Sequence, residues 1–92
     1  MPGGMIAEAM TPDPNPAAIE FLREHISIEQ HALILADIRR AGLDSWTAHN
    51  RFPFGSTVRS ALRSAGFNEQ VMGVESLDEI WGELVFRAVQ AE

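Results

Sequence analysis

Cysteine is missing from this 92-residue chain, and its absence excludes disulfide bridges, thiolate zinc sites and a cysteine nucleophile. Lysine and tyrosine are missing too, so the seven basic residues are all arginines. No apolar run approaches the roughly 20 residues of a transmembrane helix. The N-terminal sequence MPGGMIAEAM also lacks the basic and apolar regions of a signal peptide. We therefore expect a soluble, cytoplasmic bacterial protein that makes no membrane contact.

What is present fits one small domain, because so short a chain with 46% hydrophobic residues has room for a single core. Residues 1–15 carry three prolines and two glycines and show no periodic apolar pattern. Proline lacks the amide donor that helices and sheets need, so this stretch is predicted to be a disordered tail. Residues 16–92 are predicted to form a single helical domain.

The first part of the domain carries two helix-start signals. Pro16 suits the first position of a helix, where its missing N–H costs nothing, and apolar residues then recur at spacings of three and four. Ser27 opens a capping pair that predicts a helix over residues 28–41, ended by Gly42. The wide apolar surface of this helix predicts a central position. The pattern leaves open whether residues 16–41 form one kinked helix or two.

The middle of the chain predicts two more helices. A short helix is expected to run through residues 46–50, and the segment RFPFG ends it because Pro53 disfavours helical geometry at Phe52. Ser56 is then expected to cap a helix over residues 56–65. A glycine stops this helix, and the phenylalanine that follows folds back on it.

A polar loop over residues 68–75 is expected to lead into the last helix. Ser76 and Glu79 form a second capping pair, and apolar residues recur on one face over residues 77–88. No segment alternates apolar and polar residues long enough to predict a strand. The chain is therefore predicted to be all-α, a compact bundle of four or five short helices.

The residues that catalysis would need are sparse. The three histidines, His25, His31 and His49, lack the spacing of a zinc protease, and we interpret them as partly exposed polar residues. His25 and Glu29 are expected to share one helical face, but two ligands do not close a metal site. No nucleophile elbow, phosphate-binding loop or dinucleotide motif occurs. No catalytic, metal-binding or cofactor-binding residue is assigned, no cofactor is implied, and an enzyme is not expected.

Charge falls into three blocks along the chain. Residues 47–68 hold three arginines and no acid, whereas residues 1–46 carry a net charge of -4 and residues 69–92 a net charge of -5. Within the basic block, the sequence GSTVRSALRSAGF looks like the second helix of a helix-turn-helix, with Arg59 and Arg63 on its polar side. Three cations are few for phosphate contacts, and the whole chain carries -6, so DNA binding is the weaker expectation.

The segment R-F-P-F-G-S-T-V-R-S at residues 51–60 resembles a pattern of small bacterial helical proteins of unknown function, H-F-x-h-G-x-x-[IV]-R-N. Four residues match it as they stand: Phe52, Gly55, Val58 and Arg59. Arg51 stands where the pattern usually has histidine, and Ser60 where it has asparagine. The resemblance implies a small helical bacterial domain and implies no activity.

Physical roles can be predicted within this motif. Phe52 and Phe54 bracket a proline and are expected to pin the loop to the core. Gly55 is expected to allow a close backbone approach or to adopt a φ that other residues resist. Arg59 is expected to form a buried or interface ion pair with an acid of the last helix, and the alternative is an anion that it holds at the start of its own helix.

The two tryptophans are expected to differ. Trp81 lies on the apolar stripe of the last helix and is predicted to be buried. Trp46 lies next to a short polar segment and is predicted to be partly exposed, as an anchor for a partner, although in so small a domain either tryptophan can belong to the core.

These observations together predict a non-enzymatic, acidic protein-binding module. Its partner would be another protein or a second copy of itself. Such modules act as inhibitors, immunity proteins or adaptors, often encoded by mobile elements, phages or defence loci. The alternative is a helix-turn-helix regulator that uses residues 56–65, and a third, remote candidate is a small-anion binder near Ser56. The candidate interaction residues are Trp46, Arg51, Arg59 and Arg63.

Overall fold

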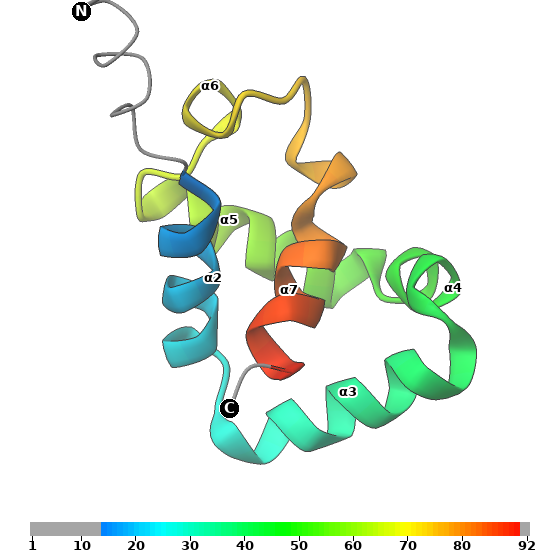
Figure 1. The fold of residues 1–92 in the computed structure, drawn as a ribbon. Coiled ribbons are helices and arrows are strands. Elements are labelled where there is room, and N and C mark those ends of the chain that lie inside the picture. Colours follow the sequence, from blue (N-terminus) through cyan, green and yellow to red (C-terminus); the bar gives the residue numbers. More distant parts are fainter. Residues whose placement is uncertain (1–13, 91–92) are drawn as a thin grey trace, which may run out of the picture.

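The computed structural model describes residues 14–90, in which six α-helices and two further helical segments, η1 and η2, follow one another without a strand (Figure 1). In chain order they are α2 (Pro14–His25), α3 (Ile28–Ala41), α4 (Leu43–His49), η1 (Arg51–Gly55), α5 (Ser56–Ser64), α6 (Glu69–Met72), η2 (Leu77–Glu79) and α7 (Trp81–Gln90). The predicted all-α class is confirmed. The predicted tail lies outside the described residues except for its last two positions, which already belong to α2.

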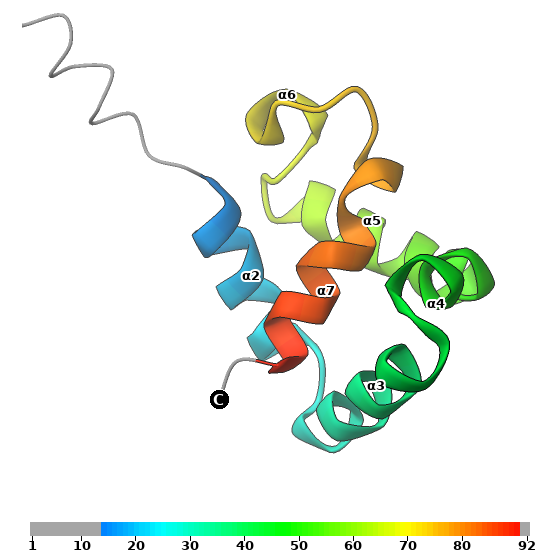
Figure 2. The same cartoon turned by 45° about the vertical axis from the view of Figure 1, so that its right-hand side comes forward.

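Helix α7 runs through the middle of the molecule, with α2 on one side and α4 on the other (Figure 1, Figure 2). It packs against α2, α3 and α4. Its buried side chains recur on one face, as an amphipathic helix against a core requires. They are Trp81, Leu84, Val85, Ala88 and Val89. The burial predicted for Trp81 and for the stripe around it is therefore confirmed, except that Ile80 is only half-buried.

The predicted last helix is divided in two, because Ile80 (φ -127, ψ -13) interrupts it between η2 and α7. Ser76 does cap the first part, but its hydroxyl oxygen accepts a hydrogen bond from the Asp78 amide, at 3.1 Å, and not from that of Glu79. The last helix therefore begins with a tight turn. That turn places Asp78 ahead of α7.

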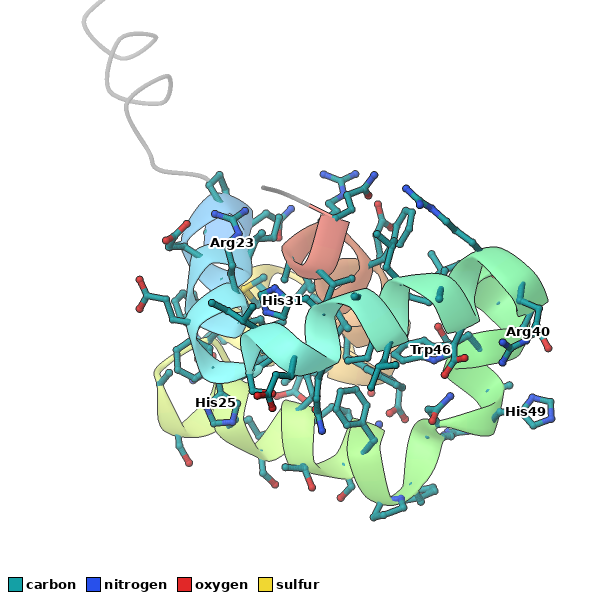
Figure 3. The ribbon with its side chains drawn as sticks, turned by 90° about the horizontal axis from the view of Figure 1, so that it is seen from below. Arg23, His25, His31, Arg40, Trp46 and His49 are labelled. Atoms are coloured by element: carbon teal, nitrogen blue, oxygen red, sulfur yellow. The ribbon has the colours of Figure 1, made fainter. Side chains whose placement is uncertain are left out.

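Helix α3 lies at the edge of the molecule, which corrects the prediction that it would be central. Only His31 and Ile38 are buried on it, whereas Ile28 is 82% exposed and Leu33 is 66% exposed. In the view of Figure 3 this helix crosses in front of the others. The wider apolar stripe of α7 already occupies the centre, so α3 packs by one narrow face.

Residues 16–41 form two helices, and His31 fastens the joint between them. Its Nε2 lies 2.9 Å from the Ile26 carbonyl oxygen and 3.1 Å from that of Arg23 (Figure 3). Both partners are acceptors, so Nε2 carries the proton and donates to carbonyls that the end of α2 leaves unpaired. The partial exposure predicted for His31 is wrong. The prediction that His25 and Glu29 share one helical face is wrong too, because His25 lies on α2 and Glu29 on α3.

Helix starts are less well predicted than helix ends. Ser27 precedes α3 as expected, but its side chain makes no capping hydrogen bond. Ser56 is already helical (φ -61, ψ -42), so its predicted capping role is wrong. Within the expected polar loop, Asn68 starts the short helix α6 by accepting a hydrogen bond from the Val71 amide at 2.9 Å.

Glycines end the helices where the sequence predicts it. Gly42 follows α3 with φ 89, and Gly66 follows α5 with φ 97. Beyond Gly66, the Phe67 amide donates to the Leu62 carbonyl at 2.8 Å, and the Gly66 amide donates to that of Arg63 at 3.0 Å. This pair of bonds is the Schellman motif, which turns Phe67 back onto α5 as expected.

Replacing His31 with alanine is expected to lower the free energy of unfolding by about 1–3 kcal/mol. The substitution leaves the carbonyls of Arg23 and Ile26 without a donor in a buried place. Urea denaturation measures the change. His49→Ala removes an exposed imidazole of α4 and is the matched control, expected to change stability by less than about 0.5 kcal/mol. Equal effects of the two substitutions would contradict this role of His31.

Candidate functional site

The loop η1 joins α4 to α5 and carries the motif singled out above. Phe52 has extended backbone geometry (φ -140, ψ 139), and the Phe52–Pro53 peptide bond is cis. The predicted end of helical geometry at this proline is therefore confirmed. A hydrogen bond of 2.7 Å from the Gly55 amide to the Asn50 carbonyl closes the loop. The Thr57 hydroxyl donates to the Pro53 carbonyl at 3.1 Å and ties the loop to the first turn of α5.

An aromatic cluster holds the inner side of η1. The Phe54 ring meets the rings of Trp46 and Trp81 edge-on, with centroid distances of 5.9 and 6.1 Å, and the two indoles lie 5.6 Å apart. Edge-to-face contacts of this kind stabilise a structure beyond the apolar area they bury. Phe54 therefore pins the loop to the core, as predicted.

Gly55 lets the loop backbone lie directly against the Trp81 ring. A Cβ atom at this position would lie 2.6 Å from Cζ2 of the indole and 3.0 Å from Nη1 of Arg59. The backbone of Gly55 is ordinary right-handed helix (φ -60, ψ -39), so space alone requires glycine here. The predicted close approach is confirmed.

Arg59 is buried beneath the loop, with 8% of its surface exposed. Its Nη1 lies 3.0 Å from Oδ1 of Asp78, and the guanidinium lies 6.0 Å from the Trp81 ring centroid. The Nη1 contact lacks the alignment of a hydrogen bond, so the attraction is chiefly electrostatic. The predicted ion pair with an acid of the last helix is confirmed, because Asp78 lies in the first part of that predicted helix. The guanidinium thus contacts a carboxylate of its own chain, at the position where the alternative prediction placed a bound anion.

Phe52 takes no part in the aromatic cluster and is 67% exposed, which corrects the prediction that both rings pin the loop. The Arg59 guanidinium lies 5.4 Å from its ring centroid, and that of Arg51 lies 6.0 Å from it. Both arginines reach the same carboxylate, since Arg51 Nη2 lies 3.2 Å from Oδ2 of Asp78. An exposed aromatic ring thus rests on two guanidinium groups that one carboxylate holds.

Two of the four predicted interaction residues, Arg51 and Arg59, come together at this place. Arg63 lies at the far end of α5, where its Nη2 donates to Glu69 Oε2 at 2.6 Å. Trp46 is only 5% exposed, so its predicted partial exposure is wrong. It is buried because its indole completes the cluster under the loop. Phe52 is the surface residue that the sequence did not predict, since nothing in the R-F-P-F segment separates it from Phe54.

The Arg63–Glu69 pair has a further effect on charge. The guanidinium, together with the amides of Glu69 and Leu77, lowers the pKa of the Glu69 carboxyl from 4.5 to about 2. The same contact raises the pKa of Arg63. The carboxylate therefore links α5, α6 and the start of η2 while it is ionised.

The part of the chain that the structure describes contains hollows, but neither a cluster of metal ligands nor a helix able to span a membrane. Among residues 14–90, no three histidine or acidic side chains are placed to hold a metal ion. In the same part of the chain, no helix combines the length and apolar content that crossing a bilayer requires. A hollow of about 390 Å³ lies between α4 and the start of α7, and its lining includes Asp44, Asp78 and Glu83 together with Arg51.

Comparisons with family models, with curated proteins and with solved structures found no match for this chain. The resemblance at residues 51–60 therefore stays a prediction based on a local motif.

Replacing Gly55 with alanine is expected to destabilise the fold by about 1–3 kcal/mol, because the added methyl group must displace the Trp81 indole. Urea denaturation measures this cost. The same substitution in a Trp81→Phe background is expected to cost less, since the colliding ring atoms are gone. An undiminished cost in that background would show that the contact with Trp81 is not the cause.

Acid stability is expected to depend on Glu69. Its pKa is lower in the folded chain than in the unfolded chain, so the stabilisation is complete above pH 4.5 and disappears as the pH falls toward about 2. Glu69→Gln should lower stability at neutral pH and flatten its pH dependence between about pH 4.5 and 2. Thermal unfolding across this range measures the effect. Glu75→Gln, in the adjoining loop, is the matched control and should keep the wild-type slope.

Proposed function

We propose that this protein is a non-enzymatic protein-binding module that inserts Phe52 into an apolar pocket of its partner. The observation that carries the proposal is the 67% exposure of this ring on a loop whose following residues, Phe54 and Gly55, pack against Trp81. Large aromatic side chains dominate the binding energy of many interfaces, usually when a partner pocket buries them.

Preorganisation supports the same proposal. Phe54 fixes η1 from within, Gly55 lies against Trp81, and Arg59 lies directly under the exposed ring. A loop fixed in this way loses little conformational entropy when a partner binds, so more of the contact energy appears as affinity.

The charges around Phe52 indicate the chemistry of the partner. The Arg51 side chain is 57% exposed beside the ring, and Pro53 next to it is exposed as well. Arg59 and Asp78 offset each other in charge, and Arg51 lies beside a hollow that is also lined by Asp44, Glu79 and Glu83. A fitting partner has an apolar pocket bordered by neutral carbonyl acceptors for Arg51, because a carboxylate there would also meet the acidic residues of this hollow.

The helix-turn-helix alternative remains a prediction, and two contacts weigh against it. Arg59 is buried against Asp78, and Arg63 is engaged by Glu69. To reach phosphates or bases, both guanidinium groups would have to leave carboxylates of their own chain. Arg51, the third arginine of the basic block, also contacts Asp78.

Phe52→Ala is expected to weaken partner binding at least tenfold while the melting temperature stays close to that of the wild type. The ring is mostly in water in the free protein, so its removal affects the complex far more than the fold. Partners are retained from host extract on immobilised protein, identified by mass spectrometry, and then titrated as purified proteins against each variant.

Val71→Ala is the matched control, because it trims an apolar side chain that is 49% exposed on α6 and leaves η1 unchanged. A genuine partner is kept by this variant and lost by Phe52→Ala. Equal affinity of both variants for every retained protein would contradict the proposal. Binding of random duplex DNA that falls steeply with salt and with Arg63→Ala would favour the regulator instead.

A further inference from the structure

The outer face of α3 carries a stripe of four residues on the side away from the core. Glu29, Leu33, Ala36 and Arg40 follow one another at intervals of four, three and four, the spacing that aligns side chains along one side of a helix. All four are exposed, Leu33 at 66%. Figure 3 shows this helix uncovered at the front of that view. We call these four residues the α3 stripe.

The α3 stripe is complementary to itself. Its acidic residue, Glu29, lies at one end and its basic residue, Arg40, lies at the other, about 16 Å away along the axis. When two copies of the helix lie antiparallel, each Glu29 meets the Arg40 of the other copy, and each Leu33 meets the small Ala36. A parallel arrangement would instead bring like charges together. The charges therefore favour one arrangement only, related by a two-fold axis.

The side chains at the two ends are able to make these contacts. Within the described part of the chain, no ion pair involves Glu29. Arg40 Nη2 donates to Asp37 Oδ1 at 2.7 Å, and the remaining guanidinium donors are free to reach a second carboxylate. The small side chain of Ala36 allows the two helix backbones to approach closely.

We infer that the protein associates with a second copy of itself through the α3 stripes, packed antiparallel about a two-fold axis. The contact is independent of the proposed function, because it uses no residue of η1. It is a weak association, since one helix about 21 Å long buries less area than a stable dimer needs. The dissociation constant is expected in the micromolar to millimolar range and to rise with salt.

Charge exchange tests this inference directly. Sedimentation equilibrium measures the dimer dissociation constant of the wild type, of Glu29→Arg, of Arg40→Glu and of the double variant, up to about 1 mM protein at low salt. Each single substitution places like charges opposite each other and should weaken the dimer at least fivefold. The double variant reverses both ends and should recover most of the wild-type affinity.

Leu33→Glu should leave only monomer, and Ala36→Glu is a second disrupting variant on the same stripe. Far-ultraviolet circular dichroism confirms that each variant keeps its helix content, which these exposed positions should allow. Phe52→Ala should dimerise like the wild type, so failure of the proposed function leaves this result unaffected. A wild type that is monomeric at about 1 mM, or single charge variants with unchanged dissociation constants, would overturn the inference. So would a double variant without recovery.

Discussion

One carboxylate joins the segments that form the surface around η1. Asp78 receives Arg59 on one oxygen and Arg51 on the other, and so joins the start of α5 to the segment that leads into α7. A buried guanidinium without a counter-ion would be strongly destabilising, so the fold requires these segments to meet. Asp78, together with Glu69 on Arg63, offsets two of the three positive charges of the basic middle block.

The contact between Arg59 and Asp78 lies between the buried aromatic cluster and the exposed Phe52 ring. Beneath Arg59, the Trp81 indole fits against a glycine backbone and completes the cluster with Trp46 and Phe54. Above it, the Phe52 ring lies over the Arg59 guanidinium and is 67% exposed, while Trp46, Phe54 and Trp81 fill the space beneath the loop. The exposed ring thus follows from the way the core is filled.

Local chemistry predicted much of this fold, and competition between helices decided the rest. The glycine stop at Gly66, the stripe of α7 and the ion pair of Arg59 depend on neighbours in sequence or on charge, and the prediction was right for each of them. The exposed face of α3 and the burial of Trp46 depend on which apolar surfaces occupy the centre of the folded molecule. The spacing of apolar residues shows that a helix has a buried face, but it does not show which helix lies at the centre. The predictions for α3 and Trp46 were therefore wrong.

The central position of α7 also bears on how the protein is made. Every helix from α2 to α4 rests, directly or through its neighbours, on a segment that the ribosome releases after them. A nascent chain that ends before Trp81 therefore has apolar faces and no common surface to cover them. Contacts between α2 and α7 span most of the described chain, and forming them is slow relative to forming local helices. The core shared by α2, α3 and α4 is therefore expected to form only after α7 has been synthesised.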